Sequence, residues 1–178
     1  MDEPCRRRRD EGGGAGGGEC GGERLRIPTT EGGVEFPGFE LIDHVAVAVP
    51  AGQMDATVAR YRQLGFAEVH REEVGGAHQV REVLLRVGGS ANLIQLLEPM
   101  SAESPVAKLL EKNGGRGGFA HLAFRVKDIH AAYAYMKEQG FHLTQEPGPG
   151  SRGTTIFFVH PKDFSYLIEV VQEGAPSV

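Results

Sequence analysis

Four side chains that could bind a metal ion recur at matching positions in two similar parts of the sequence. Two pairs of segments are alike, namely LIDHVAVAV (41–49) with FAHLAFRV (119–126), and LIQLLEP (93–99) with YLIEVVQE (166–173). This alignment pairs His44 with His121 and Gln95 with Glu169. Two imidazoles, one carboxylate and one amide oxygen form a mixed nitrogen and oxygen set that suits a divalent metal of intermediate hardness. The repeat therefore predicts one metal site on a pseudo-twofold axis.

All four residues are polar and stand within apolar strands. His44, for example, shares one face of a period-2 strand with Ile42 and Ala46. Burying a carboxylate or an amide costs roughly several kcal/mol of folding free energy unless another group pairs with it. For a single histidine, a core residue with an ordinary hydrogen-bond partner is the simpler interpretation. The recurrence of all four at equivalent positions favours the metal site.

The elements that would position these residues follow from hydrophobic periodicity. The first strand ends at Pro50, and apolar residues then recur at helical spacing up to Gly65. Three strands are predicted next, over 67–74, 79–88 and 92–98. A link helix over 104–113 leads to the second copy, with a strand at 118–126, a helix that begins near Ile129, and strands near 142–146, 153–160 and 165–172. The prediction is an α+β fold, in which two tandem β-α-β-β-β modules form a curved mixed sheet around the metal site.

The predicted domain spans 38–175, with module 1 over 40–99 and module 2 over 117–173. Residues 1–37 differ in composition, because GGGAGGGECGG fills 12–22, and they are predicted to form a disordered tail. The arginine run of this tail (6–9) is offset by acidic residues, so a solvated segment is the simpler interpretation than a nucleic-acid patch.

Composition restricts the function further. The formal net charge of −5 argues against a nucleic-acid binder, and no apolar run reaches the ~20 residues of a membrane span. Both cysteines, Cys5 and Cys20, lie in the tail, so a cytoplasmic location is expected and thiolate ligands are not. The expected partner is a small molecule, with a homodimer left open.

The repeated unit, with one ligand on its first strand and one on its last, resembles the vicinal-oxygen-chelate (glyoxalase-like, VOC) superfamily. Within it, the chain is similar to the methylmalonyl-CoA epimerase family. The segments that carry this resemblance are IDHVAVAV (42–49), YRQLGF (61–66), VREVLL (80–85), LIQLLEP (93–99), SPVAKLLEKNGG (104–115), HLAF (121–124), EPGPGSRGT (146–154) and HPKD (160–163). Two departures are Ala120, where the family usually has a second histidine, and DFSYLI (163–168), where it usually has a glycine-rich segment.

The resemblance implies that His44, Gln95, His121 and Glu169 bind one divalent metal per chain, with Co²⁺ expected first and Mn²⁺, Ni²⁺, Zn²⁺ or Fe²⁺ as alternatives. It also implies a catalytic role for Glu82 beside Glu169. From the residues alone, Glu82 is either an acid/base group that faces the cavity or a charge partner of Arg81 or Arg86.

The implied activity is a metal-dependent epimerisation of a 2-substituted malonyl-CoA. Removal of the weakly acidic α-proton gives an enolate that a metal can stabilise, and a second group returns the proton to the opposite face. Two other function classes stay open. His44, His121 and Glu169 alone form a 2-His-1-carboxylate set that suits an Fe(II) dioxygenase, although Gln95 as a fourth ligand argues against it. The third class is a metal-free binding or resistance protein.

Overall fold

The structure is a computed structural model that describes residues 36–174. Its strands form one eight-stranded mixed sheet in the order β2-β3-β4-β1-β5-β8-β7-β6. The first module contains β1 (Phe39–Ala48), α1 (Met54–Gln63), β2 (Phe66–Val74), β3 (Val80–Val87) and β4 (Leu93–Pro99). Helix α2 (Pro105–Lys112) links it to the second module, which contains β5 (Gly118–Val126), α3 (Ile129–Glu138), β6 (Gly148–Pro149), η1 (Ser151–Gly153), β7 (Thr155–Val159), α4 (Pro161–Phe164) and β8 (Leu167–Gln172). The predicted α+β fold of two tandem modules is confirmed.

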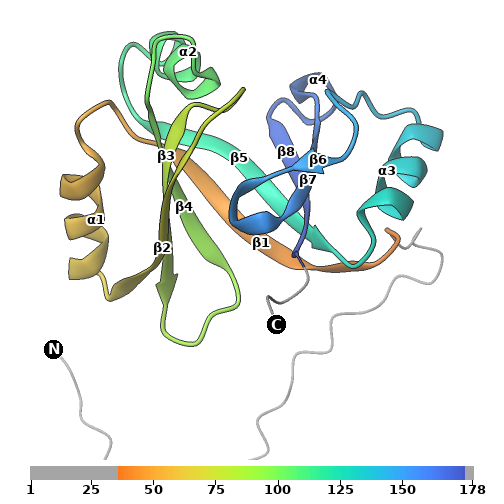
Figure 1. The fold of residues 1–178 in the computed structure, drawn as a ribbon, viewed down its shortest axis with the longest axis horizontal. Coiled ribbons are helices and arrows are strands. Elements are labelled where there is room, and N and C mark those ends of the chain that lie inside the picture. Colours follow the sequence, from red (N-terminus) through yellow and green to blue (C-terminus); the bar gives the residue numbers. More distant parts are fainter. Residues whose placement is uncertain (1–35, 175–178) are drawn as a thin grey trace, which may run out of the picture. The chain divides into compact units, whose positions relative to one another are not determined.

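The two modules meet where β1 pairs with β5. This pairing is antiparallel, whereas β1 pairs with β4, and β5 with β8, in parallel. Figure 1 shows β1 and β5 crossing the middle of the molecule, with α1 and α3 at opposite outer flanks. The first and last strands of each module therefore lie next to each other at the centre of the sheet, where the predicted ligands stand.

Each module holds the beginning of its helix in the same way. Glu98, three residues after Gln95, accepts hydrogen bonds from the backbone of Gln53 and Met54 at the start of α1. Gln172, three residues after Glu169, accepts one from the backbone of Ile129 at the start of α3. Acceptors at a helix N-terminus satisfy amides that have no partner within the helix. The internal repeat thus extends to the contacts that fix helix against sheet.

One predicted strand is wrong. The segment 142–146 forms no strand, and only Leu143 makes an isolated bridge, to Val159. The edge strand is instead the two-residue β6, which is flanked by proline at 147 and includes Pro149. Proline has no N–H to donate to a sheet ladder, so pairing cannot run far here. At the other end of β7, His160 caps the short helix α4. Within residues 36–174, no helix has the length and apolar character needed to span a membrane.

Candidate metal centre and active site

Three of the four predicted ligands converge on one point at the centre of the sheet. The Nε2 atoms of His44 and His121 are 3.1 Å apart, and the Glu169 Oε2 lies 3.4 Å from the first and 2.8 Å from the second. Two cis ligand atoms bound to one ion at about 2.0–2.2 Å lie roughly 3 Å apart. The triangle therefore has the size of three positions around a single metal ion, and all three side chains are buried.

The space at this point is made by two small residues on the paired central strands. Ala46 on β1 is paired with Gln95 on one side and His121 on the other. Ala123 on β5 is likewise paired with Glu169 on β8 on one side and with His44 on β1 on the other. Both alanines are fully buried, so no larger side chain occupies the centre. The pseudo-twofold relation predicted from the repeat is thus present in the register of the sheet.

The fourth predicted ligand, Gln95, is oriented by a carboxylate. Its Nε2 donates a hydrogen bond of 2.7 Å to the Glu82 Oε2, while its buried Oε1 has no hydrogen-bond partner. A buried acceptor without a partner costs free energy on the order of 1–3 kcal/mol. A cation beside the other three ligands would give this oxygen a partner. The donor set and the unpaired oxygen together fit a divalent metal.

The electrostatics of the centre favour a positive charge. Burial alone would lower the pKa of His44, but hydrogen bonds to Asp43 and Glu169 outweigh it and raise the pKa to about 9. Burial would likewise raise the pKa of Glu169, yet its hydrogen bonds with His121 and His44 hold that pKa well below the usual 4.5. Glu169 is therefore an anion at neutral pH in the absence of substrate, as a metal ligand must be.

Glu82 lies in the same pocket, and within residues 36–174 it forms no ion pair with Arg81 or Arg86. Arg81 makes its ion pairs with Glu73 and Glu98. The buried Glu82 carboxylate instead accepts hydrogen bonds from Gln95 and, at 3.1 Å, from the Ser151 hydroxyl. Burial raises the pKa of Glu82 above 4.5, and the Ser151 hydrogen bond opposes this only in part. A carboxylate with a raised pKa is a better proton acceptor than an ordinary surface glutamate.

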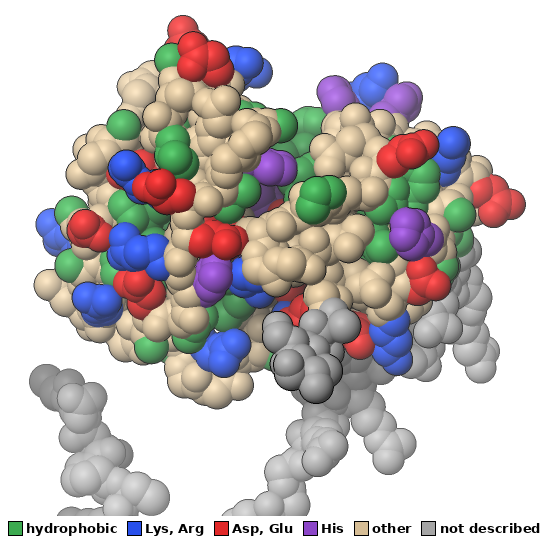
Figure 2. All heavy atoms as spheres, in the orientation of Figure 1, with side chains coloured by type: hydrophobic (Ala, Val, Ile, Leu, Met, Phe, Trp, Pro, Cys, Tyr) green, Lys and Arg blue, Asp and Glu red, His purple; other side chains and the backbone are tan. Residues whose placement is uncertain are grey.

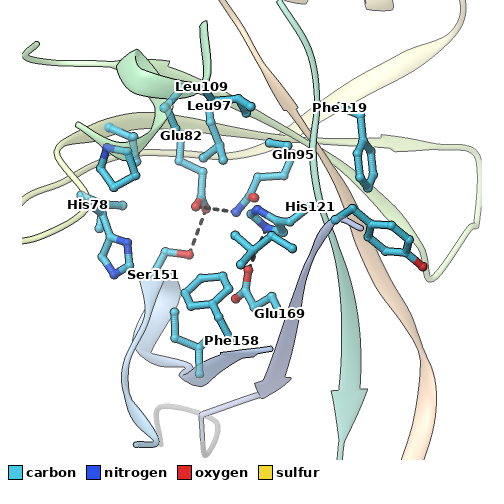
Figure 3. A pocket seen from close by; sticks show the side chains of 18 of the residues that line it. His78, Glu82, Gln95, Leu97, Leu109, Phe119, His121, Ser151, Phe158 and Glu169 are labelled. Atoms are coloured by element: carbon cyan, nitrogen blue, oxygen red, sulfur yellow. Dashed lines mark hydrogen bonds and ion pairs between the residues drawn. The ribbon is translucent and has the colours of Figure 1, made fainter. Parts of the chain in front are cut away.

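One cavity of about 470 Å³ lies between the two modules, and its polar lining includes Glu82, Gln95, His121, Ser151 and Glu169. Figure 2 shows it as a hollow in the molecular surface with hydrophobic and histidine side chains in its wall. In Figure 3, Glu82 and Glu169 approach the same space from opposite sides, with Gln95 and His121 between them. The rest of the lining is largely apolar and includes Val80, Leu97, Phe119, Ile156, Phe158 and Tyr166. The cavity can therefore take an organic molecule with one polar end against Gln95, His121 and Glu169.

Sequence reasoning missed two polar residues next to this centre. Asp43 contacts His44, and Ser151 contacts Glu82. Strand alternation places Asp43 on the face opposite His44, and Ser151 has no predicted role within the segment EPGPGSRGT (146–154). A bulge and an irregular turn bring them in, and neither has a periodic signal. Among the remaining histidines, His78 lines the cavity, and His70 lies close to Glu72 and Glu82.

The chain belongs to the glyoxalase/bleomycin resistance protein/dioxygenase superfamily, whose profile matches residues 43–158. Its similarity to the epimerase branch of that superfamily is confirmed by individual proteins. It is 37% identical over 134 residues to the ethylmalonyl-CoA/methylmalonyl-CoA epimerase of Cereibacter sphaeroides, a match that covers 74% of this chain and 96% of that protein.

Two solved structures share the fold. The methylmalonyl-CoA epimerase of Mycobacterium tuberculosis superposes with a TM-score of 0.73 at 35% identity, over 81% of this chain and 95% of that one. A variant of the Streptomyces coelicolor methylmalonyl-CoA epimerase, in complex with 2-nitronate-propionyl-CoA, gives 0.69 at 38% identity, over 77% and 99%. The similarity thus extends over nearly the whole length of each relative.

Proposed function

We propose that the protein is an epimerase of a 2-substituted malonyl-CoA that works with one divalent metal held by His44, Gln95, His121 and Glu169. The observation that carries the proposal is the placement of Glu82 and Glu169 on opposite sides of one cavity. Epimerisation at the α-carbon requires one group to remove the proton from one face and another to deliver a proton to the other face. Two carboxylates that flank the same space meet this requirement.

The residues of the proposed site have different roles in the reaction. The ligands would hold a metal that stabilises negative charge as it develops on the substrate oxygens. Gln95 and Ser151 fix the orientation of Glu82, since each donates a hydrogen bond to one of its two oxygens. Glu82 takes or returns the proton on one face of the α-carbon, and Glu169 takes or returns it on the other face. The apolar lining excludes water around the proton that moves.

For the identity of the metal we propose Co²⁺, on the basis of the mixed donor set and the family resemblance, with Mn²⁺, Ni²⁺, Zn²⁺ and Fe²⁺ as the alternatives that reconstitution would rank. For the substrate, the name of the Cereibacter relative suggests both methylmalonyl-CoA and ethylmalonyl-CoA as candidates. The cytoplasmic location and the homodimer stay predictions.

The test is proton NMR in D₂O with each acyl-CoA, with and without enzyme, because a thioester α-proton also exchanges slowly by itself. We expect enzyme-dependent loss of the α-proton signal, which stops when a chelator removes the metal. Oxygen consumption without α-proton exchange would instead indicate the dioxygenase class. Tight ligand binding with neither reaction would indicate a binding protein, and either result would refute the epimerase.

A further inference from the structure

The side chain of Asp43 is fully buried next to the metal centre without facing the cavity. Its Oδ1 lies 2.8 Å from the Nδ1 of His44, and its Oδ2 accepts a hydrogen bond of 2.7 Å from the Nε of Arg125. The Nη2 of Arg152 is 3.7 Å from the Oδ1. Arg125 also pairs with Glu173 at 2.7 Å. A buried carboxylate is thus held by two arginines from the second module and directed at a histidine of the first.

This contact exists because the strand is irregular at this residue. Adjacent side chains of a regular strand point to opposite faces, so Asp43 and His44 would not meet. In the pairing of β1 with β5, Ile42 faces Phe124 and His44 faces Ala123, which leaves Asp43 as an extra residue without a partner. Such a β-bulge changes the direction of a side chain and often occurs next to functional sites.

The hydrogen bond determines which nitrogen of His44 can bind a metal. Because the carboxylate of Asp43 is paired with Arg125, it acts as an acceptor, and the Nδ1 of His44 must carry the proton. The Nε2, which points toward His121 and Glu169, is then the nitrogen that gives up its proton to bind a metal. At the equivalent position of the second module, the residue that precedes His121 is Ala120, which has no carboxylate.

We propose that Asp43 is a positioning residue, which, together with Arg125, fixes the tautomer and ring orientation of His44 and so sets the affinity of the site for a divalent cation. Arg125 belongs to β5, so the second module holds a ligand of the first. The inference rests on the metal site proposed above, and it does not depend on which reaction the metal serves.

The test compares Asp43→Asn with Glu173→Gln in the full chain. Both changes replace a carboxylate that pairs with Arg125 by an amide, but only the first changes the group that faces His44. Because the single amide oxygen of an asparagine at position 43 pairs with the guanidinium of Arg125, its NH2 group is left facing the Nδ1 of His44 and donates instead of accepting. The affinity for Co²⁺ or Zn²⁺ is measured by competition with a chromophoric chelator, and the Co²⁺ absorption spectrum reports the ligand geometry. We expect Asp43→Asn to weaken binding roughly 10–100-fold and to change the spectrum. Glu173→Gln should stay within about twofold of wild type.

Equal affinity and an unchanged spectrum for Asp43→Asn would overturn the inference, as would an equal loss in both variants, which would indicate general destabilisation. If Asp43→Asn does not fold, ¹⁵N NMR of the histidines in Zn²⁺-loaded wild-type protein decides. The inference requires a protonated Nδ1 in His44, and a protonated Nε2 contradicts it. Failure of the wild-type protein to bind any metal would instead refute the proposed function.

Discussion

Replacing Glu82 by glutamine should lower turnover by roughly 10²-fold or more and leave the fold intact. The side chain of Glu82 accepts two hydrogen bonds, one from Gln95 and one from Ser151. A glutamine can turn its oxygen toward the Gln95 amide and its nitrogen toward Ser151, whose hydroxyl can rotate to accept. Both hydrogen bonds then persist, and only the proton-accepting carboxylate is lost.

The magnitudes separate a catalytic role from a structural one. Because burial raises the pKa of Glu82 above 4.5, its ionised form costs folding free energy at neutral pH, and glutamine removes this cost. A hydrogen bond contributes about 0.5–1.5 kcal/mol, so with both retained we expect a melting temperature within about 4 °C of wild type or above it. Loss of a general base should lower turnover by roughly 10²-fold or more, which is about 2.7 kcal/mol in activation free energy.

The assay is α-proton exchange in D₂O with each epimer of the substrate taken separately, together with thermal unfolding and metal content. Exchange from one epimer should fall more than exchange from the other, because each face has its own base. Glu73→Gln is the matched control, because Glu73 is an exposed partner of Arg81 on the neighbouring strand. This variant should change neither the exchange rate nor the melting temperature nor the metal content. Turnover within a few-fold of wild type, with a clearly lower melting temperature, would refute the catalytic role of Glu82.

Three further predictions concern the metal centre. His44 holds a proton up to about pH 9, and metal binding must displace it. The metal affinity should therefore rise with pH up to that value, by a factor that approaches tenfold per pH unit. Calorimetry in two buffers should detect the released proton. Ser151→Ala removes a hydrogen bond that lowers the pKa of Glu82, so the acid limb of the kcat/KM profile should move to higher pH, and an unmoved limb would exclude Glu82 as the titrating base. Ala123→Val should reduce metal content and cost about 1–3 kcal/mol of stability, whereas Ala131→Val on the surface of α3 should do neither.

The sequence was sufficient to predict the fold and the convergence of His44, His121 and Glu169 because both follow from periodicity and the internal repeat. Strand alternation places His44 and Gln95 on one face, and the repeat places His121 and Glu169 at the equivalent points. Small errors in the predicted ends of a strand do not change these predictions, because the face on which a side chain lies depends only on whether its position in the strand is odd or even.

The contacts of Asp43 and Ser151 could not be predicted in the same way. Alternation argues against a contact between Asp43 and His44, and the bulge that permits it depends on how β1 pairs with a strand about 80 residues later in the chain. Ser151 lies in a short irregular turn beside Arg152, whose φ of 55° is unusual for a side-chain-bearing residue. The wrong strand at 142–146 has a similar origin, because the prolines nearby decide the pairing more strongly than the local pattern does.

Ala46 and Ala123 are each paired with one residue of their own module and one of the other module, and this symmetry points to an origin of the chain by duplication. Each module carries one imidazole and one oxygen ligand, so a single module cannot coordinate a cation fully. Two copies of one module, paired through their first strands, would complete the set without any covalent connection. Fusion of a duplicated gene then frees the halves to diverge. In this chain Gln95 and Glu169 differ in charge, and the residue before the histidine is Asp43 in the first module and Ala120 in the second. The two sides of the proposed site are therefore chemically different, as a site that treats the two faces of one carbon differently requires.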